Sequence, residues 1–383
     1  MFAKLKKLGL SETKCARLHI SKNNCDQCAQ IYVNGSHIKE SEKEKYLGDY
    51  LTRFANPQAT MQDRKQKGHG ILSNTTALLE DIPLGSKRFE IGLTLRESWF
   101  MNGTLYNSEV WYAYNECDLK VLAVLDRKIL RLILNSHSKS PSEILYLETG
   151  CLPLKDVIVV RRLSYLHTIL NRPDNEIIKK VYMAQKKNPC KGDWVNLINA
   201  DKRDLDITCD DSAIAQMSLE DFKDLVKRKV RARAFSELRQ IQAGHDKVRQ
   251  IKYSSLNEAQ EYLVHKLSNN KLNKIIFNLR CQTSRNVKNN FHTQYMNNLG
   301  CIFNCVGEID SQENILTCQR LRQELSTEQL NQLNLVSYSQ IFGSVLDQQK
   351  ISKVFQMLFK IRDRLLRKDQ EPAHLGNNTG DCG

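Results

Sequence analysis

Near its start the chain reads Lys14-Cys15-Ala16-Arg17-Leu18-His19-Ile20, and about two dozen residues later it reads Lys45-Tyr46-Leu47-Gly48-Asp49. Polar and apolar residues alternate from Ala16 to Ile20 and again before Asn34-Gly35, which predicts short strands joined by a hairpin turn. Gly48 allows a close backbone approach, and Tyr46 and Leu47 offer a rigid apolar ledge. The alternating stretches around Asn34-Gly35 are the only clear β signal in the chain.

From about residue 60 onward the apolar residues follow a helical period. Apolar residues recur at three-to-four spacing from Asp118 to Asn135 and from Lys155 to Leu170, and we assign both stripes to the core. Ser140 to Glu143 is typical of a helix start, and Thr149 to Pro153 of a break. The predicted fold class is α+β and predominantly α-helical, with the small β region at the N-terminus.

The net charge of +14 is concentrated in one part of the chain. Asp201 to Asp211 is polar and is interpreted as a linker, and Ser218 with Asp221 then forms a capping pattern for a helix that runs to Gly244. Sixteen Lys and Arg stand against five Asp and Glu between Phe222 and His292. This surplus favours contact with nucleic-acid phosphates, although a solvated basic helix face is the alternative. The candidate binding residues are Lys227, Arg228, Lys229, Arg231 and Arg233.

The order of the two N-terminal motifs resembles the end of the palm in reverse transcriptases of the non-LTR retrotransposon kind. Later segments look like the thumb of these polymerases, so that the resemblance runs from about residue 5 to 200 and more loosely to 325. They are Gly92 to Arg96, Ser108 to Tyr112, Leu145 to Gly150, Arg161 to His167 and Lys191 to Trp194.

The resemblance implies a division of the chain and roles for individual residues. Tyr46, Leu47, Gly48 and Asp49 would form a primer-grip hairpin, and Lys14 would be the palm lysine. The implied regions are a palm remnant at 1–55, a helical thumb-like region at 56–200, a linker with the basic helix at 201–250, a degenerate zinc-knuckle-like region at 251–325, C-terminal helices at 326–368 and a disordered tail at 369–383.

The resemblance also implies that the metal-binding aspartates of the palm lie upstream of Lys14, where almost no chain remains. The only adjacent aspartates, Asp210-Asp211, follow the Tyr46 motif and lie in the polar linker, so we expect no catalytic role for them. We therefore expect no catalytic residues and an RNA-directed DNA polymerase that is inactive as this chain alone. Mg²⁺ would matter only if the missing palm were supplied.

Cys301, Cys305 and Cys318 resemble the C-terminal zinc knuckle of these elements, in which a His usually stands where this chain has Asn314. Zinc prefers four nitrogen or sulfur donors, so three ligands remain, and His292 or Cys281 is a candidate for the fourth. Two interpretations stay open: a site for Zn²⁺, or a decayed knuckle whose thiols pack as small apolar groups.

The expected partners are RNA and DNA, with no membrane role, because no apolar run is long enough to cross a bilayer. Met1 to Leu10 lacks the apolar centre of a secretory signal, so we expect an intracellular protein in a nuclear or cytoplasmic ribonucleoprotein. Two alternatives are kept: an element-derived nucleic-acid-binding protein without enzymatic activity, and a helical scaffold that binds protein through the amphipathic residues Val354 to Leu365.

Overall fold

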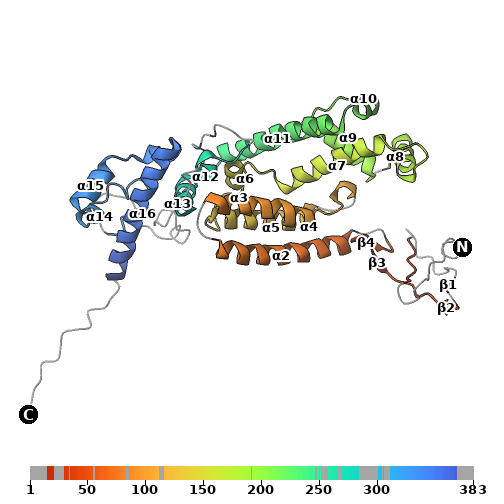
Figure 1. The fold of residues 1–383 in the computed structure, drawn as a ribbon, viewed down its shortest axis with the longest axis horizontal. Coiled ribbons are helices and arrows are strands. Elements are labelled where there is room, and N and C mark those ends of the chain that lie inside the picture. Colours follow the sequence, from red (N-terminus) through yellow and green to blue (C-terminus); the bar gives the residue numbers. More distant parts are fainter. Residues whose placement is uncertain are drawn as a thin grey trace, which may run out of the picture. The chain divides into compact units, whose positions relative to one another are not determined.

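The computed structural model (Figure 1) describes most of the chain. The described residues are 15–20, 30–33, 35–54, 57–82, 86–111, 116–190, 192–245, 248–249, 251, 253, 258–265, 270–283, 301–303, 305 and 311–368. Lys14, His292 and the segment 369–383 lie outside them.

Two antiparallel hairpins make up the β structure of the described residues. Strand β1 (Tyr32–Val33) pairs with β2 (Ser36–His37), and β3 (Lys43–Tyr46) pairs with β4 (Asp49–Thr52). Gly35 has a φ of 85°, as the predicted turn requires. The second hairpin turns at Leu47 and Gly48, whose φ angles of 47° and 92° both lie in the left-handed region. The resemblance places a hairpin at Tyr46 to Asp49, whereas the alternation pattern alone does not indicate it because Lys43 to Tyr46 is almost entirely polar.

The rest of the described structure is helical, which confirms the predicted fold class. The α-helices are α2 (Gln58–Asp81), α3 (Ser86–Leu95), α4 (Asn102–Thr104), α5 (Glu116–Leu134), α6 (Ser142–Thr149), α7 (Leu154–Leu170), α8 (Ile177–Lys187), α9 (Trp194–Asp204), α10 (Asp211–Gln216), α11 (Leu219–Ala243), α12 (Glu261–Val264), α13 (Asn270–Arg280), α14 (Gln319–Gln323), α15 (Thr327–Asn334) and α16 (Val345–Lys368). A π-helical turn η2 (Arg96–Met101) and two 3₁₀ turns, η3 (Ser108–Val110) and η6 (Tyr338–Phe342), complete the set.

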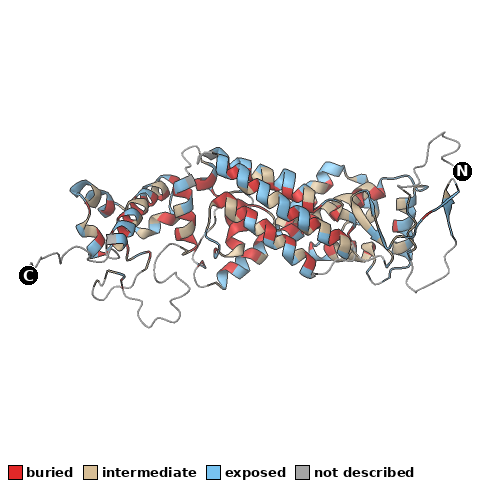
Figure 2. Ribbon diagram, turned by 90° about the horizontal axis from the view of Figure 1, so that it is seen from below, coloured by how far each residue is buried: buried red, intermediate tan, exposed pale blue. Residues whose placement is uncertain are grey.

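The chain divides into two compact units, each built from separate segments. Unit 1 comprises residues 1–76, 94–128 and 152–234, and unit 2 comprises 77–93, 129–151 and 235–383. In unit 1, helices α7 to α11 enclose a core that includes Leu163, Leu166, Phe222 and Val226. In unit 2, α13 packs against α16 and η6. Figure 2 shows the buried positions along the helices of each unit.

Several local predictions are confirmed. Helices α5 and α7 match the two apolar stripes, and α6 begins after Pro141 and ends at Gly150, which has a φ of 65°. Helix α11 begins after Ser218, whose hydroxyl accepts a hydrogen bond from the Asp221 backbone at 3.0 Å and donates one to the Asp221 carboxylate at 2.7 Å.

The predicted linker from Asp201 to Asp211 is wrong. Asp201 lies within α9, and Leu205 and Ile207 are buried in the core of unit 1. The acidic composition suggested solvent exposure, but the Asp201 carboxylate accepts a hydrogen bond from Arg162 of α7 at 2.8 Å. This ion pair allows an acidic residue to lie at the core, because its charge has a partner there.

Two expectations for the C-terminal part also need correction. The spacing of the apolar residues from Ile341 to Leu365 favours a closing pair of helices, but these residues belong to η6 and one long helix, α16. Val354, Phe355, Leu358 and Leu365 are buried within unit 2, so they do not form the exposed surface that a protein scaffold would need. Among the described helices, none is long and apolar enough to cross a membrane.

Candidate functional site

The turn of the β3–β4 hairpin is held on helix α2 by one buried arginine. Arg64 is 1% exposed; its Nη2 donates to the Gly48 carbonyl at 3.1 Å and pairs with Asp49 at 2.5 Å. Its guanidinium also lies 5.2 Å from the centre of the Tyr106 ring. Because one buried nitrogen donates to both the Gly48 carbonyl and the Asp49 carboxylate, it ties these two groups of the turn to α2. The turn is therefore a rigid feature of unit 1.

Residues after η2 hold the same turn from its other side. Nδ2 of Asn107 donates to Asp49 at 2.7 Å and to the Leu47 carbonyl at 3.4 Å. A Cβ on Gly48 would lie 2.8 Å from Cε1 of Tyr106, so this position has no room for a side chain. Gly48 thus serves close packing against Tyr106, in addition to the left-handed turn.

The anchored hairpin presents apolar side chains to solvent. Tyr46 is 63% exposed and Leu47 is 70% exposed, although both lie on a segment whose backbone is fixed. The ammonium groups of Lys43 and Lys45 lie 5.8 and 5.1 Å from the centre of the Tyr50 ring on the adjacent strand. In proteins that bind single-stranded nucleic acids, the bases stack on exposed aromatic side chains and the phosphates contact nearby cations.

Two carboxylates lie near this turn, but cations occupy both. Asp49 pairs with Arg64, and Asp63 accepts from Lys45 at 3.0 Å and pairs with Lys67 at 2.9 Å. Burial alone would raise the pKa of Asp63, but the hydrogen bonds from Lys67 and Lys45 outweigh it and hold that pKa below its ordinary value. Within the described residues, the only group of three or more potential metal ligands is formed by cysteines.

Asp210 and Asp211 have structural partners in unit 1. Asp210 is the N-cap of α10 and accepts from the Ala213 backbone at 2.7 Å. Asp211 accepts from the Tyr182 hydroxyl at 2.7 Å and from Lys186 at 2.5 Å. Burial alone would raise the pKa of Asp211, but these hydrogen bonds together with the charges of Lys186 and Lys202 hold that pKa below its ordinary value. The pair thus joins α8 to α10, and the two carboxylates are engaged separately.

The five basic residues of α11 differ in what they contact. Arg233 pairs with the fully buried Asp156 of α7 at 2.6 Å, and Lys227 lies 3.6 Å from Asp224 on its own helix. Arg228 is exposed and forms no ion pair with any residue that the structure describes, and Lys229 and Arg231 are half-buried. Arg233 therefore helps to hold α11 on α7, whereas Arg228 presents its charge to solvent.

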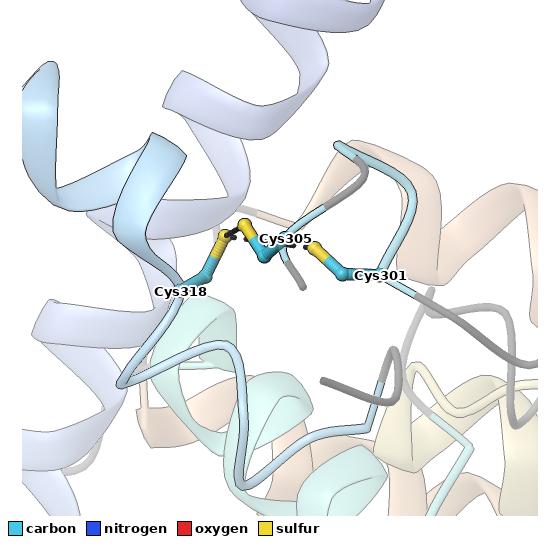
Figure 3. Close-up of side chains that lie close together, drawn as sticks. All are labelled: Cys301, Cys305 and Cys318. Carbon is cyan, nitrogen blue, oxygen red and sulfur yellow. Dashed lines mark hydrogen bonds between the residues drawn. The ribbon is translucent and has the colours of Figure 1, made fainter. Parts of the chain in front are cut away.

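The three cysteines of the predicted knuckle come together in unit 2 (Figure 3). The sulfur of Cys318 lies 3.8 Å from that of Cys301 and 3.7 Å from that of Cys305, and all three lie within 4.8 Å of one another. Cys318 is the N-cap of α14, and the other two belong to the preceding loop. The cluster could hold a metal ion, because three thiolates can donate to one centre.

The backbone around the cluster favours ionisation of one thiol. The Arg320 N–H donates to Cys305 and is the largest cause of lowering the pKa of that thiol. Burial raises the pKa of Cys318 to about 12, so this sulfur ionises only with a cation beside it. The surroundings of the cluster therefore shift the pKa values of Cys305 and Cys318 in opposite directions.

Cys281 and Asn314, the two described residues considered in connection with a fourth ligand, lie in different surroundings. Cys281 is fully buried and is not part of the cluster; burial and then the nearby Glu148 raise the pKa of its thiol well above the ordinary value. Asn314 lies in the turn before Cys318, where its backbone N–H donates to the Ser311 hydroxyl at 3.2 Å and its carbonyl accepts from Thr317. The structure therefore keeps Cys281 apart from the three clustered thiols.

Comparisons of this chain with protein-family models, with curated proteins and with solved structures give no significant match.

The sequence did not single out the residues that anchor the hairpin. Arg64 stands in a run of Lys, Gln and Asp that is typical of a solvated helix face, and Asn107 lies just after the short helix α4. Only the tertiary structure gives these two side chains a common target at Leu47 to Asp49. A usable signal was Asn107 itself, since asparagine is enriched where the backbone takes the left-handed conformation that it has here, with a φ of 59°.

Proposed function

We propose that this chain is the strand-holding C-terminal part of a non-LTR retrotransposon reverse transcriptase, which binds RNA and DNA and does not polymerise by itself. The observation that carries the proposal is the anchored β3–β4 turn, with Tyr46 and Leu47 exposed on a backbone fixed by Arg64. A rigid apolar ledge positions a primer strand at low entropic cost, because little must be ordered on binding.

The basic face of α11 supports the same proposal from a second element of unit 1. Arg228 is free of described ion partners, and the whole chain carries a net charge of +14. A surface of this kind attracts the phosphate backbone without reading the base sequence. The proposal thus predicts binding that depends on salt and tolerates changes in sequence.

The central experiment measures the binding of a labelled RNA–DNA primer–template duplex to the full chain. The double substitution Tyr46→Ala and Leu47→Ala should weaken binding by roughly 5- to 150-fold, because removing a base-stacking side chain costs about 1–3 kcal/mol. Leu335→Ala is the matched control, since this leucine is 79% exposed in unit 2 and outside the hairpin. Equal losses in both variants would contradict a role for the ledge.

A second measurement isolates the basic helix. The dissociation constant should rise steeply between low and physiological salt, and Arg228→Glu with Lys229→Glu should weaken binding and flatten that dependence. Lys180→Glu with Lys187→Glu on α8 changes the net charge equally and is the control. Arg233 is kept intact because its substitution would remove a counter-ion from the fully buried Asp156 and disturb the packing of α11 on α7.

Primer extension distinguishes this proposal from an active polymerase. The chain with Mg²⁺, primer–template and nucleotides should bind the duplex without extending it, because cations occupy both carboxylates beside the turn. Measurable extension by the purified chain would overturn the proposal. If the α11 substitutions weaken duplex binding and the hairpin substitutions do not, the result would favour the alternative of an element-derived nucleic-acid-binding protein.

We further propose that Cys301, Cys305 and Cys318 bind Zn²⁺. Sulfurs on a tetrahedral zinc at bond lengths of about 2.3 Å lie about 3.8 Å apart. The two sulfur–sulfur distances of 3.7 and 3.8 Å fit this geometry. Zinc would fix the loop to the start of α14 and would leave one coordination position for a ligand outside the three cysteines.

Titration with Co²⁺, whose thiolate complexes absorb visible light, tests the metal site directly. One equivalent should bind, and Cys305→Ser should lower the affinity by at least about tenfold, because one of three thiolates is lost. Cys190→Ser is the control, since Cys190 is exposed and lies in unit 1. If both variants bind the metal like the parent chain, the thiols are packing groups only.

A further inference from the structure

Unit 2 contains a cavity of about 430 Å³ that the proposed function does not use. Three separate segments form its wall: the residues after α5, helix α13 with the turn that follows it, and the C-terminal half of α16. Its volume lies in the range of about 300–1,000 Å³ that is typical of small-molecule sites. The lining is Ser136, His137, Ser138, Lys274, Ile275, Asn278, Thr283, Phe359 and Asp363.

The charged groups of this cavity do not neutralise each other. Lys274 and Asp363 both line it and both are exposed, yet neither forms an ion pair with any residue in the described part of the chain. The Oγ of Ser136 is buried and also lacks a described hydrogen-bond partner. The two exposed charges thus keep their hydrogen-bonding capacity for a ligand, and a ligand could also pair with the buried Ser136 hydroxyl.

The orientation of the Asn278 amide is fixed by its neighbours. Its Oδ1 accepts from the Thr283 hydroxyl at 3.1 Å and from the His137 backbone at 3.4 Å. Because both donors approach the oxygen, the opposite end of the amide is the Nδ2 group, which can only donate. Asn278, which lines the cavity together with Lys274 and Asp363, therefore carries an oriented amide group whose Nδ2 end is a donor.

These groups match one nucleobase better than the others. An ionised carboxylate only accepts, and among the four bases only guanine offers two adjacent N–H donors on its pairing edge, with a carbonyl acceptor beside them. Asp363 would accept from the two donors, and Asn278 would donate to the carbonyl. Phe359 and Ile275 supply apolar surface for the base plane, and Lys274 is a cation for its phosphate.

We propose that this cavity binds an unpaired guanine nucleotide. The inference rests on the proposed function only for the source of the nucleotide, which would be a bound nucleic-acid strand. The residues that would recognise the guanine all belong to unit 2. The proposal rests on three residues that line one cavity. Lys274 and Asp363 form no ion pair with any described residue, and the amide of Asn278 has a fixed orientation.

The first test is calorimetric titration of the full chain with GMP, AMP, CMP and UMP. GMP should bind at least about tenfold more tightly than the other three, because a bidentate contact to a base edge discriminates by about 1–3 kcal/mol. Equal binding of all four nucleotides, or no binding of GMP, overturns the inference.

A change of specificity makes the test independent of any loss of folding. An asparagine at position 363 can accept one hydrogen bond and donate another, so Asp363→Asn should weaken GMP binding about tenfold and strengthen binding of xanthosine monophosphate, whose second carbonyl replaces the guanine amino group. Glu328→Gln, an exposed charge-neutralising change on α15 of the same unit, should leave both affinities unchanged. A variant that loses GMP without gaining the xanthine nucleotide contradicts the assigned role of Asp363.

The phosphate contact and the source of the nucleotide are tested separately. Lys274→Gln should weaken GMP binding about fivefold or more while leaving guanosine binding unchanged, with Lys353→Gln on the exposed side of α16 as the control. A single-stranded oligonucleotide with one guanine should bind more tightly than GMP if the source is a strand, and no more tightly if it is the free nucleotide. The hairpin variants should not affect GMP binding, so failure here and failure of the proposed function are distinguishable.

Discussion

Unit 2 holds two groups of polar side chains that differ in whether their members are paired. The first group surrounds Glu148, which is fully buried. The Glu148 carboxylate accepts hydrogen bonds from Arg280 at 2.8 Å, from Tyr262 at 2.9 Å and from Tyr253 at 3.3 Å. In the cavity next to α16, Lys274 and Asp363 remain without described ion partners. Helix α13 contributes to both groups, since it carries Lys274 and Arg280.

The comparison distinguishes polar groups that stabilise the fold from polar groups that are available to a ligand. A charge buried beside its partners holds elements together, because breaking the pair would leave an ion in an apolar interior. Exposed charges that do not pair contribute little to folding, so a cavity can retain them for a ligand. Glu148 joins α6 to α12 and α13, whereas removal of the cavity charges should leave the fold unchanged.

The largest expected effect is on Glu148. The substitution Glu148→Gln should lower the free energy of unfolding by about 3–5 kcal/mol, because Arg280 would remain buried and charged without its counter-ion. Chemical denaturation measured by circular dichroism gives this value. The double substitution Glu148→Leu and Arg280→Met should recover part of the loss, and a loss below about 1 kcal/mol in Glu148→Gln would show that water reaches the pair.

Gly150, directly after α6, should be the next most sensitive position. Its φ is 65°, and a Cβ there would lie 2.5 Å from the backbone carbon of Glu258, which is in the segment leading to Tyr262. Gly150→Ala should therefore destabilise the chain by about 2 kcal/mol or more, through strain and displacement of that segment. Gly70→Ala, at a helical position of α2 with open space around it, should instead stabilise by about 0.5–1 kcal/mol. Equal effects of the two substitutions would contradict the close packing at Gly150.

The paired group should also make stability depend on alkaline pH. Burial, and then Glu148, raise the pKa of Tyr262 well above its ordinary value of 10.0. The unfolded chain thus releases this proton near pH 10 while the native chain retains it, so stability is full below that pH and falls as the pH rises above it. The slope should approach about 1.4 kcal/mol per pH unit for each such group. Denaturation midpoints at pH 8 and at pH 11 measure it, and Tyr262→Phe should reduce the slope.

Prediction from the sequence succeeded where a signal is local. The stripes of α5 and α7, the cap at Ser218, the turn at Gly35 and the break at Gly150 depend on neighbouring residues, and they were found. The three cysteines were singled out because their order resembles a zinc knuckle, and the structure brings their sulfurs together. The error at Asp201 has the opposite cause, since its partner Arg162 is 39 residues away in the sequence. The β3–β4 hairpin is local, but its almost entirely polar first strand gives no alternation of polar and apolar residues.

The unpredicted parts of the candidate sites also depend on partners that are distant in the sequence. Arg64 meets Gly48 from 16 residues away, and Glu148 meets Arg280 from 132 residues away. Nothing in the composition around these residues distinguishes them from solvated charges. The cavity likewise unites residues 136–138 with 274–283 and 359–363, which no local pattern connects.

The smallest expected effect concerns the unpaired cavity charges. Lys274→Gln and Asp363→Asn should each change the free energy of unfolding by less than about 0.5 kcal/mol, because exposed residues without specific partners contribute little. A double-mutant cycle tests whether the two charges interact. Their coupling energy should be near zero in the absence of nucleotide, whereas contacting pairs couple by about 0.5–3 kcal/mol. A coupling in that range would show that Lys274 and Asp363 pair with each other in solution, which would remove the contrast with the Glu148 group and the basis for a ligand between them.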